Sequence, residues 1–71
     1  MDNHSIANIN QEVYRRFPEL RGVQPRLQRI ERNILFLYKI KVHLSDQKIL
    51  NRNVRVVVNE RGEIVKISAS H

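Results

Sequence analysis

The sequence predicts a small α+β domain in which one N-terminal helix packs on one face of a four-stranded antiparallel β-meander (α-β-β-β-β). Two periodicities predict it: apolar residues recur every three or four positions near the N-terminus and every second position after Gly22. The chain has 71 residues, of which 41% are hydrophobic. This length leaves room for one folded domain, residues 1–71, with a single small core.

The helix is expected over residues 5–17, after a disordered tail of residues 1–4. Ser5 is a candidate N-cap, and Pro18 disfavours helical geometry at the residue before it, so the helix should end near Arg16. The spacing of its apolar stripe predicts that one face is buried against the sheet. The stripe consists of Ile6, Ile9, Val13 and Phe17.

The antiparallel sheet is expected over residues 23–70. Gly22 can take the positive φ that the turn before the sheet needs, and Pro25, which has no N–H to donate, places the first strand at a sheet edge. Residues 34–44 form the second strand, and "NRNVRVVVN" and "EIVKISA" form the third and fourth. "SDQK" and "ERG" are the turns between them. The stretch "VRVVVNERGEIVKIS" is similar to the closing hairpin of PepSY-type small domains, which also pair a helix with an antiparallel sheet.

The register of the first hairpin depends on its turn. A two-residue turn at Arg32 and Asn33 would place Arg26 opposite Lys39, where like charges repel. A three-residue bulged turn would shift the register by one and move every side chain of the first strand to the other face. We favour the tight turn because it buries Leu27 and Val23, each of which contributes ~1.5–3 kcal/mol when fully buried.

Side chains of the second strand alternate between the two faces of the sheet. The even positions from 34 to 44 are all apolar or aromatic, whereas the odd positions include two lysines. The helix needs an apolar face to cover, so we expect Phe36 and Tyr38 in the core and Lys39 and Lys41 on the opposite face. The two rings are then no stacking platform for bases.

A basic sheet face is the leading candidate for a binding surface. The chain carries 13 Lys and Arg against 7 Asp and Glu, a net charge of +6, which favours a polyanionic partner such as nucleic acid. A cationic surface poor in exposed rings suits double-stranded or structured nucleic acid, since contacts to the backbone need no stacking. The expected contact residues are Arg26, Lys39, Lys41, Arg55 and Lys66.

The alternative is a protein–protein interface on the same face of the sheet. A single helix cannot cover both faces, and an exposed apolar patch often marks an interface. Such a patch would serve homodimerisation or an acidic protein partner. Its expected residues are Ile30, Leu35, Leu37 and Val57, with Ile64 as a further candidate.

Catalysis, cofactors and metals are not expected. The chain has no cysteine, its carboxylates are scattered, and it has no glycine-rich phosphate loop. His4, His43 and His71 lack ligand spacing, and "HLSD" is better explained as a turn than as a nucleophile set. No small-molecule substrate is evident. No apolar run is long enough to cross a bilayer, and the N-terminus lacks a secretory pattern, so we expect a cytoplasmic protein with no membrane partner.

Overall fold

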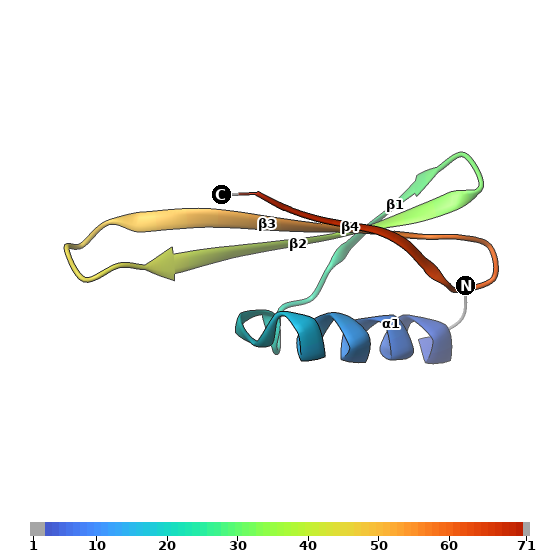
Figure 1. The fold of residues 1–71 in the computed structure, drawn as a ribbon, viewed down its shortest axis with the longest axis horizontal. Helices are drawn as coiled ribbons and strands as arrows, with labels where there is room; N and C mark the ends of the chain where they lie inside the picture. Colours follow the sequence, from blue (N-terminus) through green and yellow to red (C-terminus); the bar gives the residue numbers. More distant parts are fainter. Residues whose placement is uncertain (1–2, 71) are drawn as a thin grey trace.

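A computed structural model describes residues 3–70, with side chains from residue 5 onward. The chain forms α1 (Asn3–Arg16), the short 3-10 helix η1 (Pro18–Leu20), and β1 (Arg26–Ile30), β2 (Asn33–His43), β3 (Ile49–Val58) and β4 (Ile64–Ser70). The strands make one antiparallel sheet in the order β1-β2-β3-β4. Figure 1 shows α1 lying along one face of this sheet. The predicted α-β-β-β-β fold is confirmed.

Helix α1 begins before the predicted start. The chain is already helical at Asn3, so Ser5 lies inside the helix and the prediction that it is the N-cap is wrong. Residues 3 and 4 of the expected disordered tail are helical, while residues 1–2 lie outside the described part of the chain. The predicted end at Arg16 is confirmed, and the Phe17 N–H donates to the Val13 carbonyl at 2.8 Å.

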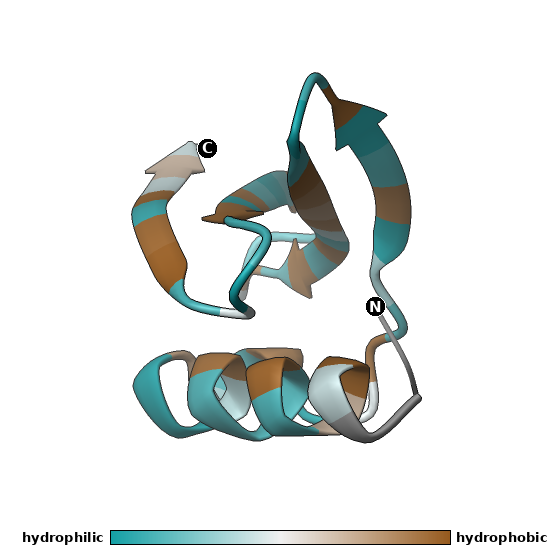
Figure 2. Ribbon diagram, turned by 90° about the vertical axis from the view of Figure 1, so that its right-hand side faces the viewer, coloured by the Kyte–Doolittle hydropathy of each residue, from teal (hydrophilic) through white to brown (hydrophobic). Residues whose placement is uncertain are grey.

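The core lies between the apolar stripe of α1 and the even-numbered side chains of β2. Val13 contributes the centre of the helix stripe, and Phe36 and Tyr38 contribute the sheet side, all with no exposed surface. Figure 2 shows the apolar side of the helix turned toward the sheet. The buried cluster comprises Ile9, Val13, Leu20, Phe36, Tyr38, Val54, Val56 and Val58.

Two tyrosines connect the helix to the rest of the fold. The Tyr38 hydroxyl donates to the side-chain oxygen of Asn10 at 2.6 Å, and the Tyr14 hydroxyl donates to the Val23 carbonyl at 2.6 Å. Their rings meet edge to face, with centroids 6.3 Å apart. Burial raises the pKa of the Tyr38 phenol well above its ordinary value, and the nearby Tyr14 hydroxyl adds to the shift. Tyr38 therefore remains a neutral hydrogen-bond donor in the folded protein.

The first hairpin turns one residue earlier than expected. Ile30 pairs with Asn33 and Arg26 pairs with Leu37, so the two-residue turn is Glu31–Arg32 and the predicted opposition of Arg26 and Lys39 is wrong. Glu31 takes a φ of +55°, which the local pairing imposes against its usual preference. The preferred two-residue turn is confirmed in length, and β1 keeps the expected faces because the register differs by two. Leu27 lies on the helix side but stays 43% exposed, so its expected burial is only partial.

The last hairpin has the expected turn and one additional irregularity. Gly62, at φ +80°, donates to the Asn59 carbonyl, and the Asn59 N–H donates to the Glu63 carbonyl, as in a type I turn closed by a bulge. A further register shift lies between Val57 and Val58, where β3 faces β4. This bulge puts Ile64 beside Val58 and the core, so its expected place on the opposite face is wrong.

The β2–β3 hairpin extends beyond the rest of the molecule. β1 pairs with β2 only as far as Leu37, and β4 pairs with β3 only as far as Asn53. Beyond these residues the hairpin is two strands wide, and it projects past the C-terminal end of α1 (Figure 1). The turn lies at Ser45–Gln47, within the expected "SDQK" segment. We call residues 39–53 the arm; at its first pair, Lys39–Asn53, β4 still lies beside β3, and residues 40–52 form the two-stranded part.

Candidate functional site

The five cations expected to bind a polyanion share the sheet face that points away from α1. We call these residues the basic face. Lys39 and Lys41 occupy odd positions of β2, opposite in direction to the buried Phe36 and Tyr38. Cross-strand pairing adds the others, because paired residues point to the same side of a sheet. Arg26 and Arg55 both pair with Leu37, and Lys66 pairs with Val57, which pairs with Leu35.

No carboxylate lies among the strand residues on this face. Its uncharged polar positions carry amides and hydroxyls, including Gln28, Asn51, Asn53 and Ser68. In the described part of the chain, Asp and Glu side chains occur on the helix side or in turns. None of the five cations forms an ion pair with another described residue, and all five are exposed. The face therefore presents uncompensated positive charge.

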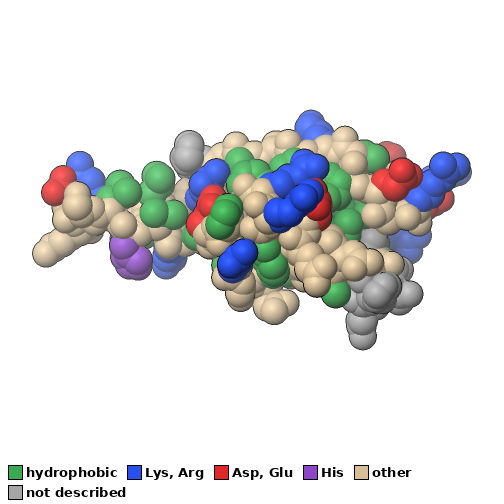
Figure 3. Space-filling view, turned by 60° about the horizontal axis from the view of Figure 1, so that its bottom comes forward, with side chains coloured by type: hydrophobic (Ala, Val, Ile, Leu, Met, Phe, Trp, Pro, Cys, Tyr) green, Lys and Arg blue, Asp and Glu red, His purple; other side chains and the backbone are tan. Residues whose placement is uncertain are grey.

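The helix side is electrostatically different, because three of its cations, Arg15, Arg16 and Arg52, are paired with carboxylates. Arg15 and Arg16 both bind the Glu12 carboxylate, at 2.7 and 3.1 Å. Hydrogen bonding from Arg15, assisted by Arg16, lowers the pKa of that carboxyl. Figure 3, which views this side, shows Lys or Arg and Asp or Glu side chains next to one another.

Arg52 is the arm residue most firmly tied to the helix side. Its guanidinium binds the Glu19 carboxylate at 2.5 Å and lies 5.6 Å from the centre of the Phe17 ring. These contacts hold η1 against β3, so we assign Arg52 a structural role.

The apolar patch expected to form a protein interface is largely covered. Leu35 is only 8% exposed, and Leu37 and Val57 are partly buried between neighbouring strands. Ile30 is 45% exposed, at the sheet edge next to the first turn. The structure groups these four residues on the expected face but leaves only Ile30 widely accessible.

The Phe and Tyr rings do not contribute to the basic face. Phe36 and Tyr38 have no exposed surface, and Tyr14 and Phe17 pack on the helix side of the core. Base stacking, which dominates many single-strand binding surfaces, has no Phe or Tyr ring to use here, and the one imidazole among the described residues of this face, that of His43, lies at the far end of β2.

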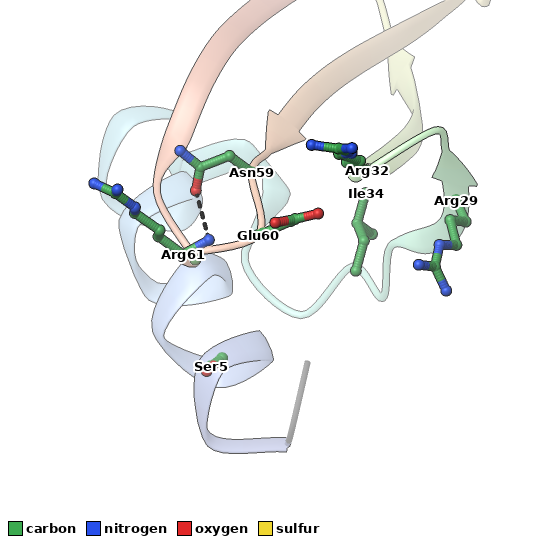
Figure 4. Close-up of a pocket in the computed structure, with 8 residues that line it drawn as sticks. Ser5, Arg29, Arg32, Ile34, Asn59, Glu60 and Arg61 are labelled. Atoms are coloured by element: carbon green, nitrogen blue, oxygen red, sulfur yellow. Dashed lines mark hydrogen bonds between the residues drawn. The ribbon is translucent and has the colours of Figure 1, made fainter.

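A second group of arginines surrounds a cavity of about 380 Å³ at the other end of the sheet. It lies between the first turn, the last turn and the start of α1, and Ile34 is among the residues that line it (Figure 4). Sequence reasoning missed this cluster, because Arg29 comes from β1 and Arg32 and Arg61 come from two separate turns. Figure 4 shows their guanidinium groups pointing apart, with the Glu60 carboxylate between them. This arrangement does not converge on one anion.

Two asparagines on the arm were also missed as binding residues. Asn53 pairs with Lys39 and Asn51 pairs with Lys41, so cation and amide lie side by side on the basic face. With Ile40 they line a shallow hollow of about 370 Å³. The alternation of Asn and Arg in "NRNVR" carries this information, since it places both amides on one face of the third strand.

Other site types have little support in the described residues. Within residues 3–70, no three His, Asp or Glu side chains are grouped closely enough to hold a metal ion. No helix in that range has the length and apolarity to cross a membrane. Comparison of the chain with models of protein families, with curated proteins and with solved structures found no match.

Proposed function

We propose that the protein is a small non-catalytic module that binds structured nucleic acid through the basic face. The observation that supports this is the charge distribution: five unpaired cations and no strand carboxylate on one side of the sheet. Such a surface gains free energy from phosphates by releasing their condensed counterions. The lack of exposed Phe and Tyr rings on this face favours duplex over single-stranded ligands. A cytoplasmic location is part of this proposal.

The protein-interaction role is the weaker candidate. The buried state of Leu35 removes the centre of the apolar patch, and the surrounding cations would repel a second copy of the same face. An acidic protein would meet the same charges as a nucleic acid, and the experiment below includes that outcome.

The test is the salt dependence of binding to a 20-base-pair duplex, measured by fluorescence anisotropy at several NaCl concentrations. The variant Arg26→Gln/Lys39→Gln/Lys41→Gln removes three cations of the basic face. The slope of log K against log salt should fall by about 2.7, because each lost phosphate contact on B-DNA contributes about 0.9.

A charge-matched variant provides the control. Arg21, Arg32 and Arg61 are exposed and lie in turns outside the basic face. The variant Arg21→Gln/Arg32→Gln/Arg61→Gln loses the same charge and should keep nearly the wild-type slope. Equal slopes for both variants would refute the assignment of the face, and binding of polyglutamate but no duplex would favour an acidic protein partner.

A further inference from the structure

The arm is the only part of the described sheet narrow enough to enter a nucleic-acid groove. Strands lie about 4.8 Å apart, so the axes of the outer strands of the four-stranded region are separated by roughly 14 Å before side chains are added. The major groove of B-DNA is about 12 Å wide and admits a two-stranded ribbon. The sheet is three strands wide at the Lys39–Asn53 pair, where Asn53 still pairs with Ser70 at the end of β4 and the outer strand axes are roughly 10 Å apart. It is two strands wide from the Ile40–Arg52 pair to the turn.

The arm presents two kinds of side chain to such a groove. Lys39 and Lys41 are long and exposed, and can reach phosphates at the wall of the groove. Asn51 and Asn53 are short, so their amides contact only what lies directly against the ribbon. An amide can bond both N6 and N7 of adenine, a pattern that identifies this base in the major groove.

We infer that the arm lies in the major groove of double-stranded DNA, with Asn51 and Asn53 on base edges and Lys39 and Lys41 on flanking phosphates. This inference rests on the proposed function and narrows it to one ligand class with a sequence preference. Charge complementarity supports it, because the arm surface that carries these residues has no carboxylate among its strand positions. Duplex RNA is disfavoured, since its deep and narrow major groove does not admit a ribbon.

The test is selection of bound duplexes from a randomised 20-base-pair DNA library, followed by anisotropy with the enriched duplex and with an RNA duplex of the same sequence. Wild type should enrich a short motif containing adenine and should bind the DNA at least about tenfold more tightly than the RNA. The variant Asn51→Ala/Asn53→Ala should lose roughly tenfold or more for the enriched duplex, as expected for lost base contacts, while its salt slope stays unchanged.

A matched variant in the four-stranded part of the same face serves as the control. It shows whether the sequence preference depends on the arm or on any polar residue of this face. Gln28 and Ser68 are exposed polar residues next to β2 and β3, so Gln28→Ala/Ser68→Ala should keep the selected motif. If wild type binds DNA and RNA duplexes equally, or if the asparagine variant keeps the motif, the inference is overturned while the proposed function stands. If wild type binds neither duplex, both fail.

Discussion

Tyr38 shows at the scale of single residues how the polar groups of this core are satisfied. Its ring has no exposed surface, yet its hydroxyl reaches Asn10 on the helix. A buried hydroxyl without an acceptor costs far more than the hydrogen bond itself contributes. This contact therefore adds a directional constraint to the position that the buried stripe of Ile9 and Val13 gives α1 on the sheet.

Replacing Asn10 by Ala should lower the free energy of unfolding by ~1–3 kcal/mol, because the Tyr38 hydroxyl loses its acceptor. Urea denaturation would measure this loss. Asn8→Ala is the control, since Asn8 is exposed on the same helix and reports the gain in helix propensity alone. The double variant Asn10→Ala/Tyr38→Phe should recover most of the loss, and additive effects of the two changes would contradict this account.

At the scale of elements, the alternation of side chains along the second strand could be predicted from the sequence. Its period of two is strong over residues 34–42, and Tyr38 is buried while Lys39 is exposed, as expected. The faces of Lys39 and Lys41 follow from this alternation, whereas the face of Arg26 also depends on the register of the first hairpin. The basic face could therefore be outlined before the structure was known, although its role as a binding surface stays a prediction.

Features that depend on a single backbone conformation could not be predicted. The first turn uses Glu31 at positive φ although Asn33, the better residue for it, is two positions away. The bulge between Val57 and Val58 moves Ile64 to the core side of the sheet. The alternation of residues in the third and fourth strands does not predict this bulge. In both places long-range packing outweighs local preference, because core burial is worth more than one unfavourable φ.

The arm should open more easily than the body of the sheet. It has a neighbouring strand on neither side beyond Asn53, and Leu44 and Ile49 near its tip are about half exposed, at 46% and 56%. Figure 3 shows hydrophobic side chains on the arm beyond the end of the helix. A two-stranded hairpin is only marginally stable alone.

Native-state hydrogen exchange should therefore give arm amides, such as those of Val42 and Leu50, a smaller opening free energy than those of Phe36 and Val56. The values for Phe36 and Val56, which lie in the core, should approach the global free energy of unfolding. When duplex DNA is added and binds, the protection of backbone amides from exchange should rise more in the arm than in the core. Equal protection throughout the free protein would show that the arm folds as one unit with the domain.

At the scale of the whole molecule, the basic face is a source of internal repulsion. Arg55 lies diagonally across from Lys39 on one side and from Lys66 on the other, and pairs with Leu37, whose other partner is Arg26. Diagonal neighbours on one face are about 7–8 Å apart, which is less than the Debye length of about 10 Å at 0.1 M salt. Folding therefore brings like charges together without a compensating carboxylate.

Replacing Arg55 by Gln should stabilise the protein at low salt, by roughly 0.5–1 kcal/mol, because it removes the most central of these charges. For a domain of this size the melting temperature should rise by about 2–8 °C in 10 mM NaCl, and the gain should shrink in 0.5 M NaCl. Arg61→Gln is the control, since Arg61 lies in a turn between Glu60 and Glu63 and its loss should not stabilise the protein.

The same Arg55→Gln change should weaken duplex binding. Stability and affinity would then move in opposite directions, as expected where a surface is kept charged for a ligand. A variant that is no more stable at low salt would show that the cations of the basic face are too well solvated to repel one another.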